Sequence, residues 1–380
     1  MLLIKNISVY APAFLGIHDI LICGNQIEAI APNLSIDPTY CTILDGTGKI
    51  LTPGLIDPHV HITGGGGEGS FHTQVPPVTL GELIEGGVTT VLGLLGTDGI
   101  TRSIENLIAK AKALNEEGIT AYACTGSYGY PSVTLTGDIK KDLAFISEII
   151  GVKLALSDHR APNVTEDELI RLASDARTAG MLSGKSGALT LHMGDAKSGL
   201  KPVFNALEKT AIPIKIFHPT HVNRNPKLLE EAFTFMQMGG TIDLTCGFDE
   251  AASPAATIAR ARAEGLPTDR ITVSSDGMGS WSTYDDRGNL TAIGYSSMDS
   301  LYRELRSMVL NYEIPLEEAL PFMTENTARA LEVFPQKGCI QKGADADLLI
   351  LTESLELETV IARGVLMMHE GKLLKKGTYE

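Results

Sequence analysis

Apolar stretches alternate with amphipathic stretches through the middle of the chain. Eight apolar stretches have the length of buried strands, and they span residues 55–59, 88–95, 119–125, 152–156, 188–192, 214–217, 241–245 and 271–274. Helical periodicity lies between them, most clearly at 103–117, 166–179, 202–209 and 226–238. Strands that alternate with helices at this spacing predict an α/β fold, a (β/α)8 TIM barrel rather than a doubly wound sheet.

The two ends of the chain have a different pattern. Short strands are predicted at 2–10, 19–23, 26–31 and 42–44 near the start, and at 347–351, 359–362 and 365–369 near the end. Neither end alone has enough apolar residues for a convincing core. We therefore expect residues 1–52 and 340–380 to form one small β-sandwich domain, with the barrel of residues 53–339 inserted between its halves.

Composition narrows the class of protein and its partners. A hydrophobic content of 43% with 20% charged residues is ordinary for a globular enzyme, and a net charge of -15 argues against a nucleic-acid partner. We expect no membrane span, because no apolar run reaches 18 residues, and no signal peptide. The five cysteines are scattered without CxxC spacing, which predicts reduced thiols in a cytoplasmic protein.

Polar residues gather where barrel strands are predicted to end, the edge at which such enzymes place their chemistry. His59 and His61 share one face at the end of the first strand, and neutral imidazole is a good ligand for zinc-like ions. Further candidates on later strands are Lys153, His192, His218, His221 and Asp276. Each of these residues, taken alone, could have an ordinary structural role: a histidine could be hydrogen-bonded in the core, the lysine could snorkel to the surface, and the aspartate could cap a helix. Their order along strands one, four, five, six and eight favours a metal site, and spacing alone leaves His218 and His221 as alternatives.

This layout resembles the amidohydrolase superfamily, as do the segments GLIDPHVH at 54–61 and KGADADL at 342–348. The resemblance implies two divalent metal ions, such as zinc, and a carboxylated Lys153 that bridges them. A buried lysine reaches the neutral form that this modification needs more easily than an exposed one. By the same resemblance, one metal is held by His59, His61 and Asp276, and the other by His192 and His221. The segment PTHVNR at 219–224 selects His221 over His218.

Three charged residues bear on the substrate. Glu68, in the glycine-rich loop 64–69, would repel a phosphate and would suit a cation such as an α-amino group. Arg160 and Arg224 follow strands four and six, and arginine binds carboxylates bidentately. A lone arginine there is more often part of an ion pair, but two arginines around a metal centre indicate a substrate with two carboxylates. One amine, two carboxylates and a hydrolysable amide describe a β-aspartyl dipeptide.

The chain also resembles the isoaspartyl dipeptidase family along essentially its whole length, through GGE at 66–68, PTHVNR at 219–224 and SDGMGS at 275–280. The substrate-binding residues implied are Gly66, Gly67, Glu68, Thr97, Tyr128, Arg160, Arg224 and Ser280, and the catalytic residues implied are Asp276, Tyr128 and Glu68. The implied reaction is attack by a metal-bridging hydroxide on the β-aspartyl amide, releasing aspartate and an amino acid. Tyr128 would stabilise the oxyanion and Asp276 would carry the proton to the leaving amine. The resemblance also implies a homo-oligomer, an octamer.

Two other functions share parts of this pattern. A cyclic-amide hydrolase of the dihydroorotase or hydantoinase type would use the same metal layout, and Glu68, Arg160 and Arg224 distinguish it from a dipeptidase. A non-catalytic scaffold with the same barrel would usually lack ligands, and none is missing. The stretch 281–297 after the last barrel strand is either a lid over the leaving group or a solvent loop.

Overall fold

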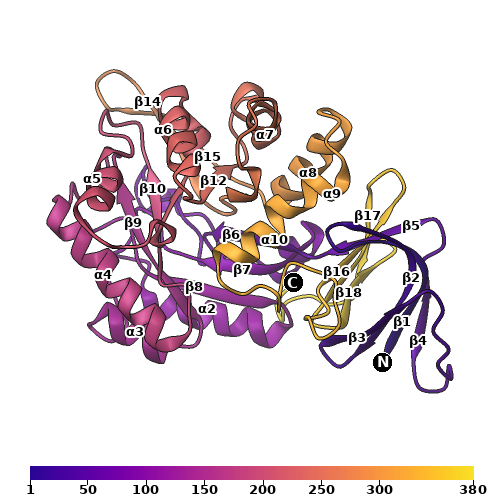
Figure 1. Cartoon of the computed structure of the whole chain (residues 1–380). Helices are drawn as coiled ribbons and strands as arrows, with labels where there is room; N and C mark the ends of the chain where they lie inside the picture. The colour runs from indigo at the N-terminus through magenta and orange to yellow at the C-terminus, as the bar shows by residue number, and fades with distance from the viewer.

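The computed structural model describes all 380 residues, and its larger part is a barrel of eight parallel strands (Figure 1). The strands are β6 (Leu55–Val60), β7 (Val88–Gly93), β8 (Thr120–Gly126), β9 (Ile149–Leu156), β10 (Ala188–Met193), β11 (Phe217–Thr220), β12 (Ile242–Thr245) and β13 (Ile271–Ser274). Strands β6 to β11 form one parallel sheet in chain order, and β12 pairs with β13. The circle closes where β11 lies against β12 and β13 lies against β6.

Helices cover the outside of the barrel. The longer ones are α2 (Ile104–Glu117), α4 (Glu166–Ser183), α5 (Lys201–Lys209), α6 (Pro226–Gln237), α7 (Pro254–Ala263) and α8 (Ser300–Leu310). The shorter ones are α1 (Leu80–Glu85), α3 (Ile139–Phe145), α9 (Leu316–Ala319) and α10 (Glu325–Ala330). Local sequence sets their ends: α4 begins with a capping box between Thr165 and Glu168 and ends at Gly184 in a left-handed conformation. None of the helices combines the length and apolar composition needed to cross a bilayer.

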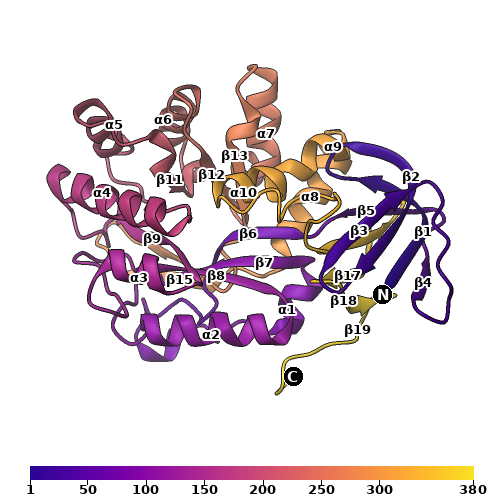
Figure 2. The same ribbon diagram turned by 60° about the horizontal axis from the view of Figure 1, so that its bottom comes forward.

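The two ends of the chain meet in one nine-stranded sheet, at the right of Figure 2. It contains β1 (Leu2–Tyr10), β2 (Phe14–Cys23), β3 (Gln26–Ala31), β4 (Thr42–Asp45), β5 (Lys49–Pro53), β16 (Leu348–Thr352), β17 (Leu357–Ala362), β18 (Val365–His369) and β19 (Lys372–Leu373). The antiparallel pair β5–β16 joins the early strands to the late ones. Residues from both ends, such as Ile4, Ile7 and Leu348, share one buried cluster.

The predicted fold class is confirmed, namely a TIM barrel with a strand-rich second part built from both chain ends. The domain boundaries at 52/53 and 339/340 stay a prediction. Strand six was predicted at 214–217, which is wrong: Ile214–Ile216 forms a 3-10 turn after Pro213, and the strand begins at Phe217. His218 therefore lies inside the strand, with its Nε2 3.3 Å from Thr272 Oγ1.

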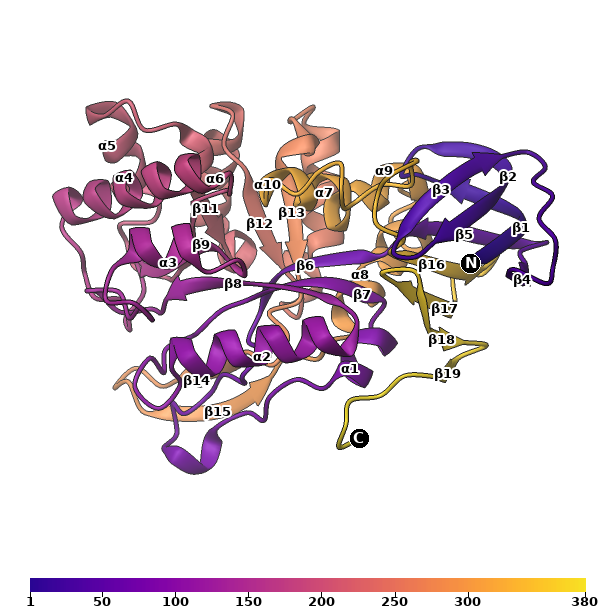
Figure 3. The same cartoon turned by 90° about the horizontal axis from the view of Figure 1, so that it is seen from below.

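The stretch 281–297 contains a β-hairpin, with β14 at Ser280–Tyr284 and β15 at Leu290–Tyr295. Figure 3 shows this hairpin beside the loop that follows β6. Two observations fix that placement. A Cβ added to Gly69 would lie 3.1 Å from Leu290, and the rings of Tyr284 and His159 lie 5.1 Å apart. The hairpin thus borders the C-terminal end of the barrel.

Candidate active site

The ends of β6, β11 and β13 bring histidines and an aspartate together inside the barrel mouth. Asp276 Oδ1 lies 3.2 Å from His61 Nε2 and 3.6 Å from His59 Nε2. Candidate ligand atoms of His59, His221 and Asp276 lie within 4.8 Å of one another, so one ion could contact all three. The rings of His221 and His192 lie 4.6 Å apart, which extends the cluster to the end of β10.

The backbone is strained at two of these residues. His221 has a φ of 63° and Asp276 a φ of 52°, a left-handed conformation that residues other than glycine seldom adopt. Such strain persists where surrounding contacts over-determine it, and it concentrates at functional sites. Beside His221, the Thr245 hydroxyl lies 2.7 Å from Nδ1, which leaves Nε2 free to bind an ion.

A buried aspartate joins β6 to the end of β13. Asp57 accepts hydrogen bonds from the backbone N–H of His59 and Ser275, each at 3.2 Å, and from the Ser275 hydroxyl. Burial raises the pKa of Asp57 to about 7, against these hydrogen bonds, which lower it. Asp57 therefore fixes the spacing between His59 and the strand end that carries Asp276.

Lys153 lies at the centre of the barrel on β9 and is completely buried. Its Nζ is 2.9 Å from Nε2 of His59. Burial lowers the pKa of Lys153 to about 7, with the Asp276 carboxylate opposing the shift. Burial therefore favours the neutral amine, the form that can react with CO2.

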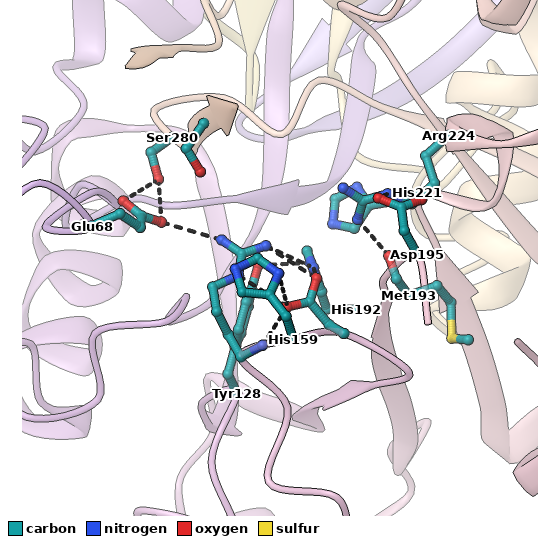
Figure 4. Close-up of polar contacts among 12 residues, drawn as sticks. Glu68, Tyr128, His159, His192, Met193, Asp195, His221, Arg224 and Ser280 are labelled. Carbon is teal, nitrogen blue, oxygen red and sulfur yellow. Dashed lines mark hydrogen bonds and ion pairs between the residues drawn. The ribbon is translucent and has the colours of Figure 1, made fainter. Parts of the chain in front are cut away.

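A second group of polar residues continues from His192 toward the glycine-rich loop (Figure 4). Nδ1 of His192 lies 2.6 Å from the Tyr128 hydroxyl, and Nε2 lies 3.1 Å from Oδ2 of Asp158. Asp158 also binds Arg160, whose Nη1 contacts Oε1 of Glu68 at 3.3 Å. The chain of contacts thus runs from a metal-ligand candidate to the loop carboxylate without interruption.

Glu68 has a further partner on the last barrel strand's loop. The Ser280 hydroxyl lies 2.8 Å and 2.9 Å from the two Glu68 carboxylate oxygens. Figure 4 places Glu68 and Ser280 on one side of His192 and Arg224 on the other. Nη1 of Arg224 donates to the Met193 carbonyl at 2.6 Å. Arg160 binds Glu68 on the first of these sides, so the two arginines lie on opposite sides of His192 (Figure 4).

The remaining predicted residues line the same region. Gly66 and Gly67 have positive φ angles of 86° and 98°, and a Cβ on Gly67 would meet no atom within 4 Å, so its backbone is open to a ligand. Thr97 is half-buried and follows Gly96, where a Cβ would lie 2.8 Å from Cε1 of His61. The predicted residues thus lie at the C-terminal ends of the barrel strands and in the loops that follow them, while His218 contacts Thr272 within the barrel.

The sequence pattern does not single out Asp158 or Thr245. Both contact histidines of the site, and each approaches its partner from a different strand of the barrel. The only sequence signal was their position at strand ends: Asp158 follows β9, and Thr245 is the last residue of β12.

The residues fit a metal site. Burial holds the pKa of His59, His192 and His221 well below the usual histidine value, so these imidazoles are neutral, as metal ligation requires. Oδ1 of Asp276 is buried without a hydrogen-bond donor, and a buried carboxylate oxygen without a donor or an ion is costly. A cation among these atoms would satisfy it.

The chain matches the amidohydrolase family over residues 50–367 and belongs to that family. Within the family it is similar to a beta-aspartyl dipeptidase from Fervidobacterium islandicum AW-1, solved in complex with beta-Asp-Leu dipeptide. The identity is 42%, 98% of each chain is covered and the TM-score is 0.93. A second structure of that organism's enzyme has 41% identity and a TM-score of 0.90, again over 98% of each chain.

More distant relatives share less with this chain. Dihydropyrimidinase from Brevibacillus agri NCHU1002 shares the fold, with 17% identity and a TM-score of 0.68 over 99% of this chain and 96% of its own. The imidazolonepropionase of Rhizobium rhizogenes is 24% identical over 96% of this chain and 94% of its own length. A Listeria monocytogenes dihydroorotase is 29% identical, but the match covers only 56% of this chain and 50% of that protein.

Proposed function

We propose that this protein hydrolyses the isopeptide bond of β-aspartyl dipeptides and releases aspartate and a second amino acid. The observation that carries the proposal is the group formed by Glu68, Arg160 and Ser280 beside the histidine cluster. It offers one anionic and one cationic partner next to a hydrolytic centre. The similarity to beta-aspartyl dipeptidases over 98% of the chain supports the same reaction.

The metal ligands of the proposal fall into two sets. His59, His61 and Asp276 would hold one divalent ion, and His192 and His221 the other, with Lys153 carboxylated to serve both. Bound zinc, or another divalent ion, would activate water near neutral pH and polarise the scissile carbonyl. The lowered pKa of the buried Lys153 amine and its contact with His59 support the carboxylation.

Tyr128 is suited to stabilise the oxyanion. Burial raises the pKa of its hydroxyl far above the usual tyrosine value, so the group stays protonated and can donate. Its oxygen lies 2.6 Å from Nδ1 of His192, beside the atom available to a metal. A carbonyl bound at that position would receive the hydrogen bond as negative charge develops.

The charged groups orient the two ends of the substrate. Glu68, which the Ser280 hydroxyl contacts, would bind the α-amino group together with Thr97, and the backbone of Gly66 and Gly67 would lie against that group. Arg160 and Arg224 would bind the two carboxylates. Asp276 would accept the proton of the attacking water and pass it to the leaving amine, because its Oδ1 has no competing donor.

The decisive experiment combines metal analysis with a substrate panel. Purified protein should contain a divalent metal and hydrolyse β-aspartyl-leucine, while α-aspartyl-leucine, hydantoin and dihydroorotate should be poor substrates. Faster turnover of either cyclic amide would replace the dipeptidase proposal with a cyclic-amide hydrolase. Protein that binds no metal when prepared with sufficient zinc would support a non-catalytic scaffold.

We also propose a cytoplasmic homo-oligomer, an octamer. All five cysteines are free, which suits a reducing compartment. Size-exclusion chromatography with light scattering measures the oligomeric state directly.

A further inference from the structure

The carboxylate of Asp158 has partners on both sides of the site. Oδ2 contacts Nε2 of His192 at 3.1 Å and Nη2 of Arg160 at 3.2 Å. Oδ1 accepts from the backbone N–H of Arg160 at 2.8 Å and from its Nε at 3.0 Å. The side chain of Asp158 is only 2% exposed, so solvent does not compete for these contacts.

These contacts determine the tautomer of His192. Nε2 of His192 also lies 3.4 Å from Nη2 of Arg160, which can only donate, but its contact with Asp158 is the shorter one. An ionised carboxylate only accepts hydrogen bonds, so Nε2 of His192 carries the proton that it donates to Oδ2 of Asp158. Nδ1 is then left with its lone pair, and this is the nitrogen that the Tyr128 hydroxyl approaches at 2.6 Å. The only ring nitrogen of His192 able to bind a metal is therefore Nδ1, on the side of Tyr128.

The chain makes room for Asp158 at one specific position. Gly194 follows β10, and a Cβ built there would lie 2.6 Å from Oδ2 of Asp158 and nearer still to its Cα and Cβ. Any side chain at 194 would push the carboxylate away from His192. Gly194 gives a second, independent way to disturb the same contact.

We propose that Asp158 is a positioning residue that acts in two directions at once. It fixes His192 with Nδ1 toward the metal site, and it holds the guanidinium of Arg160 beside Glu68. A hydrogen bond to the ring nitrogen that does not bind the metal generally orients a metal-binding histidine and raises the basicity of its other nitrogen. The inference rests on the proposed function for its substrate, but its effect on His192 can be measured without any substrate.

Three variants separate the two directions. Asp158→Ala removes the contacts with both His192 and Arg160. It should therefore lower the affinity for the metal held by His192 and His221 by about 10- to 100-fold and also raise KM. Asp158→Asn keeps an oxygen that can accept from His192 but loses the charge that binds Arg160. It should retain metal affinity within a few-fold and raise KM with little loss of kcat. Gly194→Ala should resemble Asp158→Ala in metal affinity.

Two readouts are independent of turnover. Histidine-selective 15N NMR of metal-free protein should show the Nε2–H tautomer for His192 in the wild type and in Asp158→Asn, and a mixture of tautomers in Asp158→Ala. Competition with a chelator gives the affinity of each zinc ion, and only the ion held by His192 and His221 should bind more weakly. Asp175→Ala, which removes a surface aspartate paired with Lys140, is the matched control and should change neither.

The outcomes are distinguishable. A folded Asp158→Ala protein, judged by circular dichroism, that keeps the Nε2–H tautomer and wild-type zinc affinity would overturn the positioning role. If Asp158→Ala does not fold, the same unchanged results in Gly194→Ala would overturn it. A wild-type protein that fails to cleave β-aspartyl-leucine would instead overturn the proposed function, while the tautomer and the zinc affinity would still decide the role of Asp158.

Discussion

Glu68 and Arg160 bind each other, with Oε1 and Nη1 3.3 Å apart, although the proposed reaction assigns them to opposite charges of the substrate. Their side chains are 6% and 19% exposed, so the pair is largely shielded from water. A dipeptide that offers an ammonium to Glu68 and a carboxylate to Arg160 would exchange one ion pair for two. Neither charged group is left unpaired before or after binding, which keeps the desolvation cost of binding low.

Replacement of Glu68 by glutamine should impair substrates that have a free α-amino group. Losing a hydrogen bond to a charged group costs about 1.5–3 kcal/mol, which corresponds to roughly a 10- to 150-fold decrease in kcat/KM. Comparing β-aspartyl-leucine with its N-acetyl derivative measures this effect, because the derivative lacks the ammonium. Equal losses for both substrates would remove Glu68 from amine recognition, and Glu353→Gln on the surface provides a control.

Asp276→Asn should fold and retain metal but lose turnover. The amide cannot take up and release the proton that the leaving amine needs, and this role contributes on the order of 10²- to 10⁴-fold to a rate. Steady-state kinetics beside metal analysis and a thermal melt measure the three properties separately. Near-normal kcat in a metal-loaded variant would exclude Asp276 as the proton carrier.

Recovery of activity after metal removal should depend on CO2. If Lys153 is carboxylated, zinc added to chelator-treated protein in CO2-free buffer should restore activity slowly and incompletely, and bicarbonate should accelerate the recovery. Burial lowers the pKa of Lys153 to about 7, which favours the neutral amine that reacts with CO2. Identical recovery with and without bicarbonate would argue against the carbamate, and a Lys153→Met protein should not respond to bicarbonate at all.

Lys337 should contribute strongly to stability. It is 2% exposed and binds Asp345 at 2.8 Å, together with Asp347 and the Thr120 hydroxyl at the start of β8. Lys337→Met would leave the buried Asp347 and the partly buried Asp345 without a cation, which costs about 3–5 kcal/mol. Urea unfolding measures the loss. Lys342→Met is the matched control: its ion pair with Glu28 is exposed, and its removal should cost about 0–1 kcal/mol.

Asp243 should make the metal-free protein less stable as pH rises from about 4 to about 6. Burial raises its pKa from the ordinary value of 3.8 to about 6, against hydrogen bonds from Ser274, Thr220 and Thr272. The folded protein therefore binds a proton more tightly than the unfolded chain, and the free energy of unfolding falls by about 3 kcal/mol across this interval.

Comparison of the wild type with Asp243→Asn isolates this contribution. The difference between their urea-unfolding free energies should change by that amount between pH 4 and pH 6 and stay constant above pH 7. Parallel curves across the whole range would show that Asp243 titrates normally in the folded protein.

The sequence predicts the barrel strands, and the shared face of His59 and His61, because both depend on local patterns, whereas the full set of metal ligands is implied only by the family resemblance. Buried parallel strands are continuous apolar runs, and residues two apart on a strand share a face, which brings His59 and His61 together. The contact of Asp158 with His192 joins residues 34 positions apart, and only the closed barrel makes them neighbours. The left-handed backbone at His221 likewise follows from surrounding contacts rather than from the residue type.

The missed strands had a different cause. β14 and β15 are mostly exposed and lack the apolar alternation that marks a strand. β5 belongs to the same apolar run as β6, and only Gly54 separates them. A Cβ at Gly54 would overlap the side chain of Thr89, so the chain passes there too close to β7 for any other residue.

The shared sheet has a consequence for synthesis of the chain. β5 pairs with β16, and Lys49 contacts Glu358, which lies 309 residues later. Translation therefore produces the first five strands long before their partners leave the ribosome. Throughout elongation of the barrel, the growing polypeptide carries an open strand edge that neighbouring nascent chains could join, and only the last segment to be made closes it.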